Sequence, residues 1–166
     1  YTNGTVSCTG ATKTFTITVN PSSQVNQPSN QVVCNGSVTT AVVFTTNNTP
    51  GTTTYSWTNS DPTIGLAATG TGNITAFTAI NTGILIVATI TVTPTYTNGT
   101  VSCTGATKTF TITVNPSSQV NQPTDQVVCN GNTTTAVAFS TINTGGTTTY
   151  SWKNSDLTIG LAASGT

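Results

Sequence analysis

The feature that most constrains the fold is a long internal repeat. The segment from Tyr1 to Asn20 returns letter for letter from Tyr96 to Asn115, which sets a period of 95 residues. Over the whole overlap, residues 1–71 against 96–166, 60 of 71 positions are identical. This period is too long for one solenoid turn and close to the size of one β-sandwich domain. Each repeat can therefore bury a core of its own.

The repeat divides the chain into three segments. Residues 1–20 are predicted to be the C-terminal strand region of one repeat, residues 21–115 a complete repeat, and residues 116–166 the N-terminal portion of the next. Residues 21–30, stiffened by Pro21 and Pro28, are predicted to connect neighbouring units. Because these boundaries cut across domains, we expect the chain to be a segment of a longer polypeptide.

Charge is scarce, with three lysines, three aspartates and no histidine. A neutral chain offers no electrostatic footprint for phosphate backbones or anionic lipid, so binding to nucleic acid or to a membrane surface is disfavoured. No apolar run reaches the roughly 18 residues of a membrane-spanning helix. We therefore expect no nucleic-acid partner and no membrane span.

Alternation of apolar and polar residues predicts the strands. From Lys13 to Val19, Phe15 and Ile17 share a face with Val19 and threonines occupy the other face, which predicts a half-buried strand. Its copy at 107–114 is expected to bring Phe110 and Ile112 into the core of the complete repeat.

Five further strands are predicted in the complete repeat, at 31–34, 39–46, 53–58, 73–79 and 84–93. An Asn35-Gly36 turn follows the first of them, and residues 94–106 are predicted to be a long loop. No helical period is present. The pattern predicts an all-β fold, an antiparallel β-sandwich of six to eight strands per repeat. The other expected core side chains are the largest inward-facing ones, Phe44, Tyr55, Trp57 and Ile90.

The four cysteines also follow the repeat. Cys34 and Cys103 lie in the complete unit, and Cys8 and Cys129 are their copies in the flanking segments. A bridge between Cys34 and Cys103 is favoured, with Cys8 and Cys129 pairing with equivalents outside the chain. One alternative joins Cys8 to Cys34 and Cys103 to Cys129 across units, and another leaves the cysteines as free buried thiols; the sequence leaves these readings open. Either bridge implies an oxidising, extracellular location.

Four segments of the repeat carry a resemblance to a known family. QVVCNGSVTTAVVF, TTTYSWTNSDPTIGLAATGTGNI, ATITVTPTY and SCTGATKTFTITVNP resemble the PKD-like, immunoglobulin-like repeats of giant Bacteroidota surface proteins, including adhesins and gliding-associated proteins. The resemblance implies tandem immunoglobulin-like sandwiches exported to the cell surface, with Cys34 and Cys103 as the bridge and Trp57 in the core. The chain departs from antibody domains at Val101, where no tyrosine corner is present.

Catalysis and metal binding are not expected. General acid–base and nucleophilic catalysis need titratable groups beside one another, and this chain has no histidine, no glutamate and three scattered aspartates. Zinc would need a CxxC or histidine ligands, and calcium several carboxylates, whereas Asp61 is the one carboxylate of residues 21–115. No catalytic residue, cofactor or metal ligand is therefore predicted.

The expected function is structural. The resemblance implies an extracellular fibre, filament or adhesin stalk. The near-perfect repetition and the uncharged surface predict that its partners are neighbouring identical repeats or chains. Each unit is expected to complete its own fold, and the alternative donates the strand 107–114 to a neighbour. A rival function is adhesion to glycans or surfaces through Tyr55 and Trp57, although their alternation makes them core residues by default.

Overall fold

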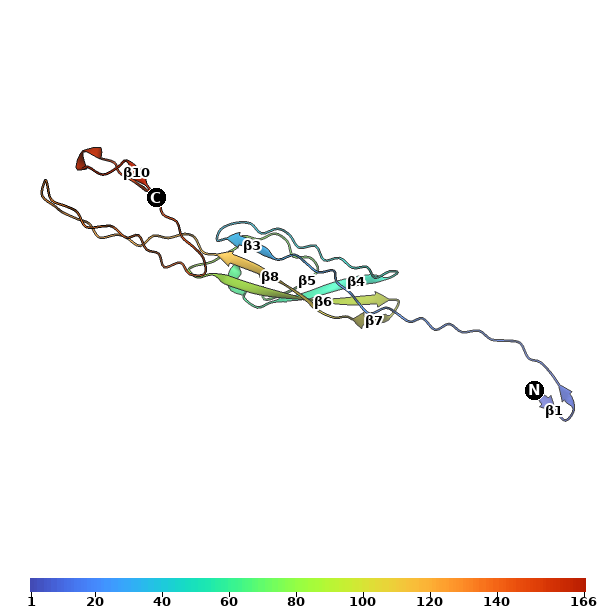
Figure 1. Ribbon diagram of the computed structural model, residues 1–166. Coiled ribbons are helices and arrows are strands. Elements are labelled where there is room, and N and C mark those ends of the chain that lie inside the picture. Colours follow the sequence, from blue (N-terminus) through green and yellow to red (C-terminus); the bar gives the residue numbers. More distant parts are fainter.

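The computed structural model describes residues 1–166 and shows an all-β chain, as predicted. The complete repeat lies in the middle, and the flanking segments extend from its two ends in opposite directions (Figure 1). The only helical elements are two 3₁₀ turns, η1 (Pro62–Ile64) and η2 (Leu157–Ile159). None of the helical segments has the length and apolarity needed to cross a membrane.

Six strands of the complete repeat form one sheet in the order β3-β8-β6-β4-β5, with β7 also paired to β6. All neighbouring strands are antiparallel except β3 and β8, which are parallel. The first strand of the repeat therefore pairs with its last, and the unit closes on itself. The strands are β3 (Gln31–Cys34), β4 (Thr52–Asn59), β5 (Thr69–Thr71), β6 (Ile86–Asn98), β7 (Val101–Thr104) and β8 (Lys108–Asn115).

Strand β6 is longer than predicted, because it continues through Pro94 instead of ending at Thr93. Pro94 lies opposite Tyr55 in the ladder, and its carbonyl accepts a hydrogen bond from the Gly105 amide at 3.0 Å. A proline lacks only the donor, so the alternation of inward side chains runs on to the fully buried Tyr96. The predicted loop at 94–106 is wrong: most of it is the β6–β7 hairpin.

A layer of extended chain covers one face of the sheet. Residues 37–45 and 73–80 are joined to each other at two isolated bridges, Val38 with Thr78 and Val42 with Ile74. The strands predicted at 39–46 and 73–79 are thus reduced to single bridges. The 14 buried side chains of the core come from both layers, and Phe44 meets Phe110 edge-on with ring centroids 6.5 Å apart.

The segment predicted to connect units, residues 21–30, packs onto the complete repeat. Ser23 and Val25 are buried, and the Asn26 amide donates to the Thr45 carbonyl at 2.8 Å. A Cβ built on Gly105 would lie 1.8 Å from the Ser23 carbonyl oxygen, so only glycine allows this close approach. The segment is therefore integral to the unit and not a free linker.

The flanking segments contain little regular structure. The strand predicted at 13–19 is wrong for this chain: the segment is extended but has no partner strand, and Phe15, Ile17 and Val19 are 84%, 80% and 87% exposed. Beyond it lies an isolated hairpin of β1 (Thr2–Asn3) and β2 (Val6–Ser7). The only strands of residues 116–166 are the pair β9 (Trp152–Lys153) and β10 (Ser164–Gly165), with η2 between them.

Candidate functional site

The aromatic pair Tyr55 and Trp57 belongs to the core. Trp57 is 7% exposed, and a Cβ on Gly70 would lie 2.1 Å from its ring, so the β5 backbone covers it. Tyr55 is half-buried against Phe44, with ring centroids 5.4 Å apart, and burial raises the pKa of the Tyr55 hydroxyl. Trp57 therefore offers no open face on which a sugar ring could stack.

The other predicted core residues lie where the alternation put them. Ile90, Phe110 and Ile112 are fully buried or nearly so and belong with Phe44 and Trp57 to one cluster. Sequence reasoning missed Asn81, which is buried and donates from Nδ2 to the carbonyls of Ile84 at 2.7 Å and Val114 at 2.6 Å. The alternation of apolar and polar residues could not identify Asn81, because it does not detect a buried side-chain amide that donates to backbone carbonyls.

The structure does not bring Cys34 and Cys103 together. Cys34 lies opposite Asn115, beside the Ile86 end of β6, whereas Cys103 pairs with Tyr96 on the same strand. Ten residues of extended chain separate these two ends, roughly 33 Å at about 3.3 Å per residue. A disulfide needs Cα atoms within about 7 Å, and all four cysteines are free thiols here.

The alternative pairing across units is not formed either. Cys8 follows β2 of the isolated N-terminal hairpin, which Figure 1 places far from the central unit that contains β3 and Cys34. Cys129 belongs to the segment that follows β8, whereas Cys103 lies on β7 at the other end of the complete unit (Figure 1). Cys8, Cys34 and Cys129 are exposed, so their sulfurs are accessible to other molecules.

Contacts between consecutive repeats occur at both ends of the complete unit. At one end the Asn98 side chain donates from Nδ2 to Oδ1 of Asn20 at 2.9 Å. At the other, Asn35 Nδ2 donates to the Ser117 hydroxyl at 3.1 Å. The loop 143–148 of the next repeat approaches this second end, where a Cβ on Gly145 would lie 3.0 Å from Leu85. The repeats thus meet through short polar and close-packed contacts and not through charge.

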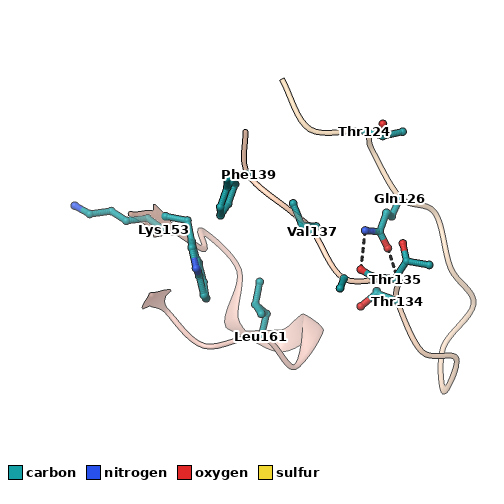
Figure 2. A pocket seen from close by; sticks show the side chains of 10 residues that line it. Thr124, Gln126, Thr134, Thr135, Val137, Phe139, Lys153 and Leu161 are labelled. Carbon is teal, nitrogen blue, oxygen red and sulfur yellow. Dashed lines mark hydrogen bonds between the residues drawn. The ribbon is translucent and has the colours of Figure 1, made fainter. Parts of the chain in front are cut away.

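An apolar hollow lies on the last segment of the chain. Figure 2 shows Val137, Phe139 and Leu161 around a hollow of about 550 Å³, which Trp152 also lines. Gln126 closes one side by exchanging two hydrogen bonds with the Thr135 backbone, at 2.9 and 3.0 Å. The hollow holds side chains of the core type at half-exposed positions, which makes it the candidate interaction site of this chain.

Two of the three aspartates are engaged in local turns. Asp61 and Asp156 cap η1 and η2, each accepting from the amide and the hydroxyl of the threonine two residues on, Thr63 and Thr158. No group of three or more histidine, cysteine, aspartate or glutamate side chains is close enough to hold a metal ion.

No protein-family model, no curated protein and no solved structure matches this chain. Its function is accordingly inferred from the repeat, the closed unit, the contacts between repeats and the open hollow.

Proposed function

We propose that this chain belongs to a structural extracellular protein in which tandem immunoglobulin-like units form a surface fibre, filament or adhesin stalk. The observation that carries the proposal is the combination of a near-identical 95-residue repeat with one copy that closes its own core. A repeat that is complete in itself can be joined end to end many times without a new fold being needed at each step.

The immunoglobulin-like assignment belongs to this proposal. It is supported by a mostly antiparallel sheet covered on one face by a second layer of extended chain, with the aromatic core between them. The extracellular location and the stalk role follow from the resemblance of the repeat to bacterial surface-protein domains.

The contacts between repeats support an end-to-end arrangement. The chain enters the complete unit beside Asn98, at one end of β6, and leaves it at Asn115, beside the other end. Entry and exit at opposite ends of the longest strand support an arrangement of successive units along one axis (Figure 1). The 13 residues of β6 span about 43 Å, so we expect an axial repeat of roughly that length per unit.

Small-angle scattering of the 166-residue chain tests the proposed shape. A compact domain of this size would have a radius of gyration of roughly 15 Å. We expect at least twice that value, with the pair-distance distribution of a rod. Electron microscopy of native material should then show filaments with an axial spacing near that predicted from β6. A compact particle in solution would refute the stalk.

Limited proteolysis tests whether the middle unit is self-contained. Cleavage is expected in the exposed residues 1–20 and in residues 116–166, leaving a protected fragment close to residues 21–115, because backbone with few buried contacts opens most readily. Digestion of the whole chain at a uniform rate would contradict a self-completed unit.

A further inference from the structure

One face of the central sheet is covered by hydroxyl side chains. The strands of the complete unit send alternate residues into the core, and the residues between them point to the opposite face. On that face the outward residues of β4, β5 and β7 are all threonine or serine, as are those of β6 from Thr89 to Thr97 and of β8 from Thr109 to Thr113. We call these residues the hydroxyl face.

The hydroxyls form rows across the sheet, because outward residues of neighbouring strands lie directly opposite one another. One row joins four strands, through Thr109 of β8, Thr91 of β6, Thr58 of β4 and Thr69 of β5. Further rows follow at every second residue of β6, roughly 6.6 Å apart. The hydroxyl face is therefore a regular array in two dimensions.

Most hydroxyls of this face are free to bond a partner. Within the protein, Thr97 shares a hydrogen bond with the Ser102 hydroxyl at 2.9 Å, and Thr54 donates to the Thr95 carbonyl at 3.5 Å. The other side-chain hydroxyls of the face make no hydrogen bond within the protein. A hydroxyl both donates and accepts, so a surface made of hydroxyls is chemically complementary to a copy of itself.

The chemistry of the face favours an uncharged partner. The face contains no charged side chain that would attract an ion or a charged polymer. It also has no aromatic ring for a sugar to stack on, because Trp57 and its neighbours Tyr55 and Phe110 lie on the core side of the sheet. Like charges that would keep two such faces apart are absent as well.

The size of the face suits a weak interface with a second copy. It extends roughly 30 Å along β6 and about 19 Å across four strands, which is an area of roughly 600 Å². Two copies would together bury on the order of 1,000 Å², the lower limit for a specific interface. In a tandem chain the face recurs with every repeat, so many weak contacts can add along two aligned molecules.

The geometry points to a second copy of this chain as the occupant: the hydroxyl face of one complete unit packs against the hydroxyl face of another molecule. Two sheets packed face to face lie about 10 Å apart with their strands about 30° from alignment, so the threonine side chains interdigitate. This inference rests on the proposed stalk function and deepens it by naming the surface through which neighbouring stalks associate side by side.

One position of the face changes in the next repeat, where the copy of Thr58 is Lys153. Two lysines that met across an interface would repel each other, whereas two threonines do not. We therefore expect the face of the complete unit to pair with its own copy in preference to the pairing of two lysine-bearing faces.

Sedimentation velocity of the full chain measures the association. A reducing agent is present throughout, because three of the four free cysteines are exposed and could cross-link molecules. We expect the wild-type chain to associate reversibly with a dissociation constant on the order of 0.1–1 mM, as a small polar interface allows. A wild-type chain that stays monomeric well above this range would overturn the inference.

A pair of opposite charges tests whether the face meets its own copy. Thr91→Lys and Thr91→Glu each place one charge at the centre of the face, and each variant alone should associate at least tenfold more weakly at low ionic strength. An equimolar mixture of the two should regain the wild-type association, because opposite charges then meet. A mixture that associates no better than either variant alone would contradict pairing of identical faces.

Val43→Lys is the matched control. Val43 is 65% exposed on the layer that covers the other side of the sheet, so its replacement should leave both the association and the melting temperature unchanged. A loss as large as that of Thr91→Lys would place the contact on the covering layer and overturn the inference. The rod shape measured by scattering of the dilute monomer does not depend on this contact, so the stalk and the lateral pairing fail separately.

Discussion

The two copies of KTFTITVN show how much of a strand is determined by its surroundings. At 108–115 the sequence lies between β3 and β6 and buries every second side chain, and at 13–20 it has no neighbour and buries none. Alternation makes a segment compatible with a half-buried strand, but the strand forms only where a partner supplies hydrogen bonds and a covering layer. The identical sequence rules out local propensity as the cause of the difference.

The loops differ from this strand, because they have the same hydrogen bonds in both copies of the repeat. Gln31 exchanges two hydrogen bonds with the Thr40 backbone, and its copy Gln126 does so with Thr135. Asn59 donates to the Leu66 carbonyl at 3.0 Å, and Asn154 donates to that of Leu161 at the same distance. Turns of this kind are set by residues within about ten positions of one another, so they need no distant partner.

Truncating the matched phenylalanines Phe110 and Phe15 should give the largest difference in unfolding free energy between the two copies. Phe110→Ala removes a fully buried ring that meets Phe44, and we expect the free energy of unfolding of the complete unit to fall by about 3–5 kcal/mol. Phe15→Ala should leave it unchanged, because Phe15 is 84% exposed and its segment has no partner strand. Chemical denaturation followed by tryptophan fluorescence measures both. Equal losses for the two variants would mean that residues 13–20 fold into a unit of their own.

A smaller effect is expected from the matched glycines Gly105 and Gly10. A Cβ at Gly105 would meet the Ser23 backbone, which cannot move without displacing the buried Val25. Gly105→Ala should therefore destabilise the unit by about 1–3 kcal/mol. Gly10 has nothing within 4 Å of its would-be Cβ, and Gly10→Ala should be neutral. A neutral Gly105→Ala in the same denaturation assay would show that residues 21–25 do not pack on the unit.

Replacing the matched turn residues Asn59 and Asn154 should give a still smaller difference in unfolding free energy. Asn59→Ala removes the donor to Leu66 and the acceptor for the Asp61 amide in a buried setting, and we expect a loss of about 1 kcal/mol in unfolding free energy. Asn154→Ala breaks the same two bonds where water can replace them, so its effect should be within error. A comparable loss in both variants would show that residues 116–166 unfold together with the complete unit.

The contrast between locally determined turns and strands that need distant partners explains which elements of the fold could be predicted from the sequence. The all-β class, the short strand at 31–34 and the inward position of Phe44 follow from alternation within a few residues. The continuation of β6 past Pro94 was missed because proline usually ends a strand, although Tyr96 carries the alternation on. The single bridges at Val38 and Val42 could not be anticipated, because they depend on how two distant segments approach.

The candidate site was harder to predict than the core. Trp57 and Phe44 were expected inside from their periodicity, and the complete unit places them there. Their copies Trp152 and Phe139 have the same periodicity and line an open hollow, so no local pattern distinguishes a filled site from an empty one. The predicted bridge between Cys34 and Cys103 is not formed, for a related reason. Repetition shows that the thiols recur in pairs, but their separation along β6 depends on the sheet register.

The smallest prediction concerns the carboxylate of Asp156 at the start of η2. The Thr158 hydroxyl and amide both donate to it, at 2.6 and 2.9 Å, and these hydrogen bonds favour the charged form and lower the pKa of Asp156. Thr158→Val removes the hydroxyl donor, so the pKa of Asp156 should rise toward its usual value while the amide bond keeps some of the shift. A carboxyl-detected NMR titration measures this change directly.

The sign of the pH effect follows from the direction of that shift. A carboxylate whose pKa is lowered in the folded state favours the η2 turn above its ordinary pKa, and this contribution is lost as the pH falls through the lowered value. Asp156 is fully exposed, so the turn should loosen in acid while the complete unit keeps its melting temperature. An unchanged pKa of Asp156 in Thr158→Val would mean that the hydroxyl bond from Thr158 does not act on this carboxylate. It would contradict the view that the η2 turn is determined by its own residues. Unfolding of the central sheet at the same pH at which Asp156 is protonated would also contradict this view. It would show that residues 116–166 and the complete unit, which we infer to be independent, are coupled.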